Sequence, residues 1–183
     1  MAKSRVAIAV DSTAYIPPGL VKKYNIHVIP QILNWEGESL LDDVDIKPVA
    51  FYERLKTAKE MPTTSQPSAG EFHDFFVNIT ETADSIVGIF VSDDLSGTLD
   101  SARTAAKMMG DFPLEIVDSR TTSMGLGFLV LEAARAAEEG LNHLEVAEAV
   151  QALIPKMHVL FVVDTLEFLH RGGRIVGSVS FLA

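Results

Sequence analysis

Residues 6–13 read VAIAVDST, a short apolar run rich in branched side chains that ends in three polar residues. Such a run is typical of a strand buried on both faces in a parallel sheet, because neither face then meets water. Three further runs share this character: Ile86–Val91, Leu114–Val117 and Val159–Val163. We expect each of them to be a strand, and His27–Leu33 is a fifth candidate.

Segments with the apolar spacing of amphipathic helices separate these runs. They are Pro48–Lys59, Ser68–Ala83, Gly97–Met109, Met124–Glu139 and Leu144–Lys156. Two pairs, Ser68 with Glu71 and Asn142 with Glu145, fit a capping box, in which two side chains each take a free backbone N–H at a helix start. The alternation of strands and helices predicts a three-layer α/β/α domain with a mainly parallel sheet.

The chain length of 183 residues is enough for one full core and part of another. We expect residues 1–156 to form an N-terminal α/β domain and residues 157–183 to begin a second α/β lobe that stays incomplete. Inside the first domain, Asn34–Ser39 lies between two apolar patches and contains a glycine suited to a turn. This segment predicts a hairpin within the alternating pattern.

Composition excludes several classes of function. The 25 acidic residues outnumber the 15 basic ones, and the net charge of −10 repels nucleic-acid backbones and anionic lipid headgroups. The longest apolar runs are far shorter than the roughly 20 residues of a membrane-spanning helix. Because cysteine is absent, disulfides, thiolate zinc sites and cysteine catalysis are excluded. No secretory signal pattern precedes Asp11, so we expect a cytoplasmic protein that is not integral to a membrane.

Ligands of such folds gather beyond the carboxyl ends of the strands, and here those ends are rich in hydroxyl groups. In the loop Met61–Ser68, three hydroxyls and an amide lie between Pro62 and Pro67 and before a helix N-terminus, where free N–H groups and the helix dipole attract an anion. The loop Asp93–Thr98 repeats this pattern with a hydroxyl, a glycine and a second hydroxyl. Both loops are able to converge on one anion, and plain turn and cap chemistry is the alternative for each.

Four motifs occur in the order and approximate spacing of the DegV family: Val10–Thr13, Thr64–Ser68, Leu95–Thr98 and Gly172–Ile175. Together they span nearly the whole chain, which therefore resembles the front two-thirds of a DegV-type protein. The resemblance implies a two-lobed protein that binds a long-chain fatty acid. In such a protein the acyl tail lies in an apolar tunnel and the carboxylate lies at the surface between the lobes.

Carried over residue by residue, the resemblance implies that Thr64 and Ser96 bind the carboxylate, with Ser65, Gly97 and Thr98 as supporting contacts. It also implies a separate fatty acid kinase as partner, which uses ATP to form an acyl-phosphate. On this reading the chain is a lipid-binding carrier rather than an enzyme. It has the fatty acid as its ligand and needs no catalytic residue, metal or cofactor.

Charged residues near these motifs bear on the same prediction. Arg174 follows the Gly172-Gly173 turn and is a candidate contact for the head group or for the partner; a solvated arginine beyond a tight turn is the alternative. Asp93 and Asp94 stand where the family more often has small or hydroxyl residues. Two carboxylates disfavour a bound anion unless they point into solvent.

A phosphatase-like hydrolase is the competing prediction, because its nucleophilic aspartate would follow a strand as Asp11 does. Thr13 weakens it, since metal binding and general acid catalysis need a second carboxylate at that position. A serine hydrolase lacks the Gly-x-Ser-x-Gly pattern around Ser96, and a nucleotide-binding enzyme lacks both glycine-rich phosphate motifs. The 5 histidines are scattered, with no zinc-binding spacing.

Overall fold

The computed structural model describes residues 5–174, and its centre is a four-stranded parallel sheet in the order β2-β1-β6-β7. The strands are β1 (Val6–Asp11), β2 (His27–Ile29), β6 (Ser85–Phe90) and β7 (Leu114–Asp118). Every residue of β6 is buried, as expected of a central strand covered on both faces. Three of the predicted apolar runs are therefore strands of one sheet.

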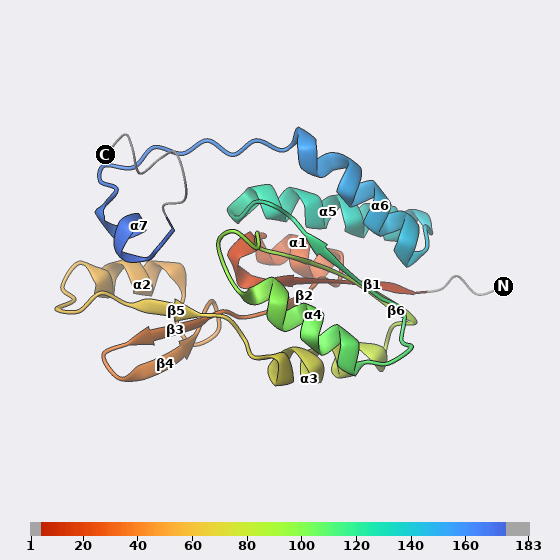
Figure 1. Cartoon of the computed structure of the whole chain (residues 1–183), viewed down its shortest axis with the longest axis horizontal. Helices are drawn as coiled ribbons and strands as arrows, with labels where there is room; N and C mark the ends of the chain where they lie inside the picture. The colour runs from red at the N-terminus through yellow and green to blue at the C-terminus, as the bar shows by residue number, and fades with distance from the viewer. Residues whose placement is uncertain (1–4, 175–183) are drawn as a thin grey trace.

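Helices cover both faces of this sheet (Figure 1). One layer contains α3 (Ala69–Thr80) and α4 (Thr98–Met108), packed on a core that includes Phe72, Phe76 and Phe90. The opposite layer contains α1 (Pro18–Lys23), α5 (Ser123–Glu139) and α6 (His143–Leu153), packed on a separate apolar cluster. The predicted three-layer α/β/α architecture is confirmed.

The predicted helix starts are also confirmed in atomic detail. In α3 the Ser68 hydroxyl accepts from the Glu71 backbone N–H at 3.2 Å, and the Glu71 carboxylate accepts from the Ser68 backbone N–H at 2.7 Å. The same reciprocal box, built from Asn142 and Glu145, starts α6. The described residues also form three short helical elements: η1 (Ser12–Ala14), η2 (Ile154–Lys156) and α7 (Glu167–Arg171). Within residues 5–174 no helix has the length and apolar character to cross a membrane.

A small antiparallel sheet lies beside the parallel one (Figure 1) and contains β3 (Ile32–Trp35), β4 (Glu38–Leu41) and β5 (Thr63–Ser65), in the order β4-β3-β5. With α2 (Pro48–Leu55) it encloses its own core around Leu33 and Trp35. The predicted hairpin is present: Glu36 and Gly37 have φ of 51° and 83°, the positive values of a tight two-residue turn. The sheet itself was not predicted.

Two strand predictions are corrected by the structure. His27–Leu33 is not one strand but the whole of β2 followed by the start of β3, because Pro30 has no N–H to donate and interrupts the pairing. Val159–Val163 forms no strand: it lies outside helices and strands, and Leu160 and Val162 are 96% and 98% exposed. Its composition suits a buried strand, but no strand of the described residues pairs with it. The predicted domain boundary at residue 156 stays a prediction.

Candidate functional site

Thr64 and Ser65 lie on β5, at the edge of the small sheet. Thr64 pairs with Leu33 of β3, and its side chain is exposed. The Ser65 hydroxyl is half-buried and accepts a hydrogen bond from the Asn34 amide at 3.2 Å. Of the two hydroxyls, Thr64 is therefore the one presented at the surface.

Ser96 lies in the loop between β6 and α4, and Thr98 is the first residue of α4. Their hydroxyl oxygens are 2.8 Å apart, and the Thr98 backbone N–H donates to the Ser96 hydroxyl at 3.3 Å. Thr98 is fully buried, whereas Ser96 is only partly covered. The Ser96 hydroxyl is thus held by Thr98 at the start of α4.

Gly97 brings the two hydroxyl-bearing loops together. A Cβ atom at Gly97 would lie 2.8 Å from the side-chain nitrogen of Gln66, closer than real Cβ atoms approach. The φ of Gly97 is −71°, so glycine is needed for this close approach and not for an unusual backbone angle. Thr64 and Ser96 make no hydrogen bond to each other, but their loops touch at Gln66 and Gly97.

Gln31 is a site residue that sequence reasoning missed. It is 7% exposed, and its side-chain nitrogen donates to the Thr98 hydroxyl oxygen at 3.0 Å. Its backbone N–H donates to the Ser12 hydroxyl at 3.1 Å, and that hydroxyl donates to the Asp42 carboxylate at 2.6 Å. An amide inside the otherwise apolar run His27–Leu33 was the signal that could have found it.

Arg174, the candidate contact for the head group or the partner, lies beside Thr64. Its guanidinium Nη2 donates to the Thr64 hydroxyl oxygen at 3.3 Å. The exposed Thr64 hydroxyl therefore has a cation within hydrogen-bonding reach, which suits recognition of a carboxylate.

The neighbouring carboxylates of Asp93 and Asp94 are both exposed and both paired. Asp93 lies 3.5 Å from the guanidinium of Arg103, and Asp94 lies 3.1 Å from that of Arg120. The side chains of the two aspartates are 42% and 68% exposed, so they face solvent. This arrangement reduces the repulsion that two free carboxylates would exert on a bound anion.

Asp11 is buried and fully engaged, which does not fit a nucleophile. Its two carboxylate oxygens accept from the backbone N–H groups of Thr13, at 3.0 Å, and Val91, at 2.8 Å. With 0% exposure it ties the end of β1 to the end of β6. The competing hydrolase therefore loses its proposed nucleophile.

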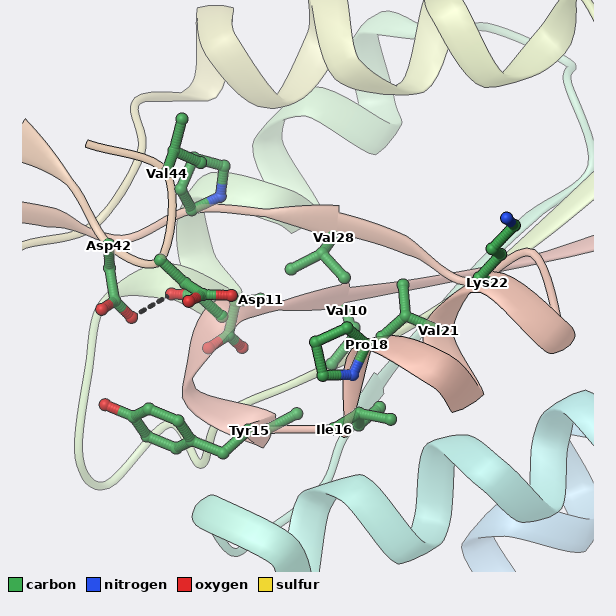
Figure 2. Close-up of a pocket in the computed structure, with 14 residues that line it drawn as sticks. Val10, Asp11, Tyr15, Ile16, Pro18, Val21, Lys22, Val28, Asp42 and Val44 are labelled. Atoms are coloured by element: carbon green, nitrogen blue, oxygen red, sulfur yellow. Dashed lines mark hydrogen bonds between the residues drawn. The ribbon is translucent and has the colours of Figure 1, made fainter. Parts of the chain in front are cut away.

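A pocket of about 310 Å³ opens at the carboxyl end of β1 (Figure 2). Apolar side chains of β1, α1 and β2, such as Val10, Val21 and Val28, form most of its wall, and Asp42 lies at one end. Neither Thr64 nor any residue of the Ser96 loop lines it. The pocket is thus separate from the hydroxyl-bearing loops, although the Ser12–Asp42 hydrogen bond runs along its wall.

Fold and site together define a three-layer α/β protein with hydroxyl groups on β5 and before α4, and with an arginine beside Thr64. A family model described as "Uncharacterised protein, DegV family" matches residues 5–183, and the chain belongs to the DegV family. A DegV domain-containing protein of Caldanaerobacter subterraneus is 39% identical over 178 residues, which cover 97% of this chain and 63% of that protein.

Solved structures of the family have the same fold. A DegV family protein from Thermus thermophilus, described for fatty acid binding, superposes with a TM-score of 0.89 at 35% identity, covering 97% of this chain and 63% of that one. DegV from Bacillus subtilis, described as a fatty acid binding protein, gives a TM-score of 0.86 at 29% identity, covering 98% and 64%. This chain thus spans somewhat less than two-thirds of the length of these relatives.

Proposed function

We propose that this protein binds a long-chain fatty acid and presents its carboxylate to a separate fatty acid kinase, which forms the acyl-phosphate. The contact between Arg174 and Thr64 is the observation that carries the proposal, because it joins a cation and a surface hydroxyl. Together with Ser96 they offer a carboxylate two hydroxyl donors and one charge-assisted donor. Thr98 holds the Ser96 hydroxyl, while Gly97, which lies against Gln66, and Ser65, which is bonded to Asn34, are the proposed supporting contacts.

An exposed apolar run supports the lipid part of the proposal. Val159 packs near Gly125 at the start of α5, and the run Val159–Val163 continues toward α7 and Arg174. Apolar side chains as exposed as Leu160 and Val162, at 96% and 98%, favour a hydrophobic cover. An acyl chain against them would gain about 0.8 kcal/mol per buried CH₂. The fatty acids bound by the Thermus and Bacillus relatives agree with this ligand class.

Native mass spectrometry followed by lipid extraction tests the proposal. The wild-type chain is expected to carry a fatty acid, and the Thr64→Ala, Ser96→Ala double variant to lose it. A matched double variant, Ser101→Ala with Thr104→Ala, removes two hydroxyls from α4 outside the site and should keep the ligand. Addition of a fatty acid kinase and ATP should then give acyl-phosphate. A wild-type protein without lipid that hydrolyses phosphate esters, and loses this activity in Asp11→Asn, would replace the proposal by the hydrolase.

A further inference from the structure

We infer that Gln31 fixes the direction of the hydrogen bonds at Ser96, so that the Ser96 hydroxyl is held as a donor and selects an ionised carboxylate over a neutral head group. The inference rests on the proposed function, and it names a positioning residue that acts on the ligand through Thr98. It starts from four hydrogen bonds among Gln31, Thr98 and Ser96.

The position of the Gln31 side chain is set by hydrogen bonds of the Gln31 backbone. The backbone N–H of Gln31 donates to the Ser12 hydroxyl at 3.1 Å, and its carbonyl oxygen accepts from the Asp42 backbone N–H at 2.9 Å. Both anchors hold the link between β2 and β3, where Gln31 is 7% exposed. The amide therefore reaches Thr98 from a rigid and largely dry position.

Thr98 has one hydroxyl proton and room to accept two hydrogen bonds. The Gln31 side-chain nitrogen lies 3.0 Å from the Thr98 oxygen and donates to it. The Thr98 proton then has two acceptors in reach, the Ser96 oxygen at 2.8 Å and the Gln31 side-chain oxygen at 3.5 Å. Because hydroxyl hydrogen bonds are strongest near 2.7–2.8 Å, the proton goes to Ser96.

Ser96 receives two donors in this arrangement. Its oxygen accepts from the Thr98 hydroxyl at 2.8 Å and from the Thr98 backbone N–H at 3.3 Å. Both acceptor positions of the Ser96 hydroxyl are then in use, and its own proton has no acceptor among the described residues. The free proton can go to a ligand oxygen.

This direction has a chemical consequence for the head group. An ionised carboxylate only accepts hydrogen bonds, so it matches a hydroxyl that only donates. An alcohol can offer its own proton, which the filled Ser96 oxygen is unable to accept. With leucine at position 31, the hydrogen bond between Thr98 and Ser96 could have either hydroxyl as its donor. Glutamate at position 31 would accept the Thr98 proton, and the Ser96 hydroxyl would then donate to Thr98 instead of to the ligand.

Titration of the lipid-free 183-residue chain with dodecanoate and with dodecanol tests the inference, with the ratio of the two dissociation constants as the readout. The wild type should prefer dodecanoate. In Gln31→Leu this preference should fall by about fivefold, and in Gln31→Glu by about tenfold or more, since hydrogen bonds to charged groups are the strong ones. Gln151→Leu, an exposed glutamine on α6, is the matched control and should keep the wild-type ratio.

A double-variant cycle separates positioning from a general structural effect. If Gln31 acts through Thr98, the Gln31→Leu, Thr98→Val double variant should show the same ratio as Thr98→Val alone. Gln31→Met, closer in shape, replaces Gln31→Leu if the latter does not fold, as judged by circular dichroism. Wild-type binding with an unchanged ratio in the Gln31 variants, or effects that add to those of Thr98→Val, overturns the inference alone. A wild type that binds neither compound overturns the proposed function with it.

Discussion

Arg174 donates from its guanidinium Nη2 to the Thr64 hydroxyl oxygen at 3.3 Å, although the two residues are 110 positions apart in the chain. This bond joins the turn after α7 to the edge strand β5 of the small sheet. It places a guanidinium that has no acidic partner of its own among residues 5–174 beside an exposed hydroxyl. A cation held in this way is available to a bound anion.

Replacement of Arg174 by glutamine should weaken fatty-acid binding by about tenfold, because a charge-assisted hydrogen bond is lost. Lysine at position 174 keeps the charge but not the planar two-donor geometry of the guanidinium. Arg174→Lys should therefore weaken fatty-acid binding less than Arg174→Gln does. Calorimetric titration at low and high salt measures both effects, and only the variants that retain the charge should remain salt-sensitive. Arg135→Gln, which removes an exposed arginine paired with Glu132 on α5, should bind as the wild type does. Equal affinities for the wild type, Arg174→Gln and Arg174→Lys would remove Arg174 from the site.

Arg120 masks the charge of Asp94, to which it is paired at 3.1 Å. In Arg120→Gln the Asp94 carboxylate is freed and should weaken fatty-acid binding by about two- to threefold, in the range of exposed ion pairs. Adding Asp94→Asn to this variant should restore most of the affinity. If the restored variant binds no better than Arg120→Gln, the repulsion does not reach the ligand.

Gly97→Ala tests the contact between the two loops. The new Cβ atom would lie 2.8 Å from the side-chain nitrogen of Gln66, which is exposed and free to move away. The melting temperature should therefore change little, whereas fatty-acid affinity should fall severalfold because the Gln66 side chain is displaced from its contact with Gly97. Shortening the opposing side chain, in Gly97→Ala with Gln66→Ala, should return the affinity toward that of Gln66→Ala alone. A large drop in melting temperature would show instead that Gly97 is needed for the fold.

Local patterns made the parallel sheet and its helices predictable. The reciprocal cap at Ser68 and Glu71 depends on residues three positions apart, and β6 depends on a continuous apolar run that needs no distant information. The small sheet could not be read in this way. Its strands have three or four residues each, and Asn34 pairs with Thr63 across a segment that contains β4 and α2. Exposed Val159–Val163 has the same composition as a buried strand but no partner in the described part of the chain.

The residues of the candidate site likewise differ in whether local sequence or long-range contacts reveal them. Thr64 and Ser96 were predicted from motif resemblance, since each lies in a recognisable loop. Gln31 was missed because its amide contacts Thr98 across 67 positions. Its place in a mostly apolar run indicates a buried amide but does not indicate the partner of that amide. Arg174 was predicted only as a candidate contact, and its bond to Thr64 likewise depends on how distant segments fold together.

The capping box of α3 should make stability depend on acid pH. The Ser68 hydroxyl, and then the Ser68 backbone N–H, hold the pKa of the Glu71 carboxyl below its usual range. A carboxyl whose pKa is lower in the folded state stabilises the fold above its unfolded pKa of about 4.3, and this contribution is lost as the pH falls through the folded value. Glu71→Gln should therefore lower the free energy of unfolding at pH 7 by about 1 kcal/mol, a typical cost of losing a cap.

Urea denaturation of the wild type and Glu71→Gln at neutral and at acid pH measures this dependence. The difference between the two proteins should be largest at pH 7 and should shrink toward zero as the pH falls through the lowered pKa of the folded state, where Glu71 becomes protonated in the wild type as well. Glu148→Gln, an exposed residue on α6, controls for the loss of one negative charge and should show little difference at either pH. If Glu71→Gln is equally destabilised at both pH values, the box contributes through its shape and not through the ionised carboxylate.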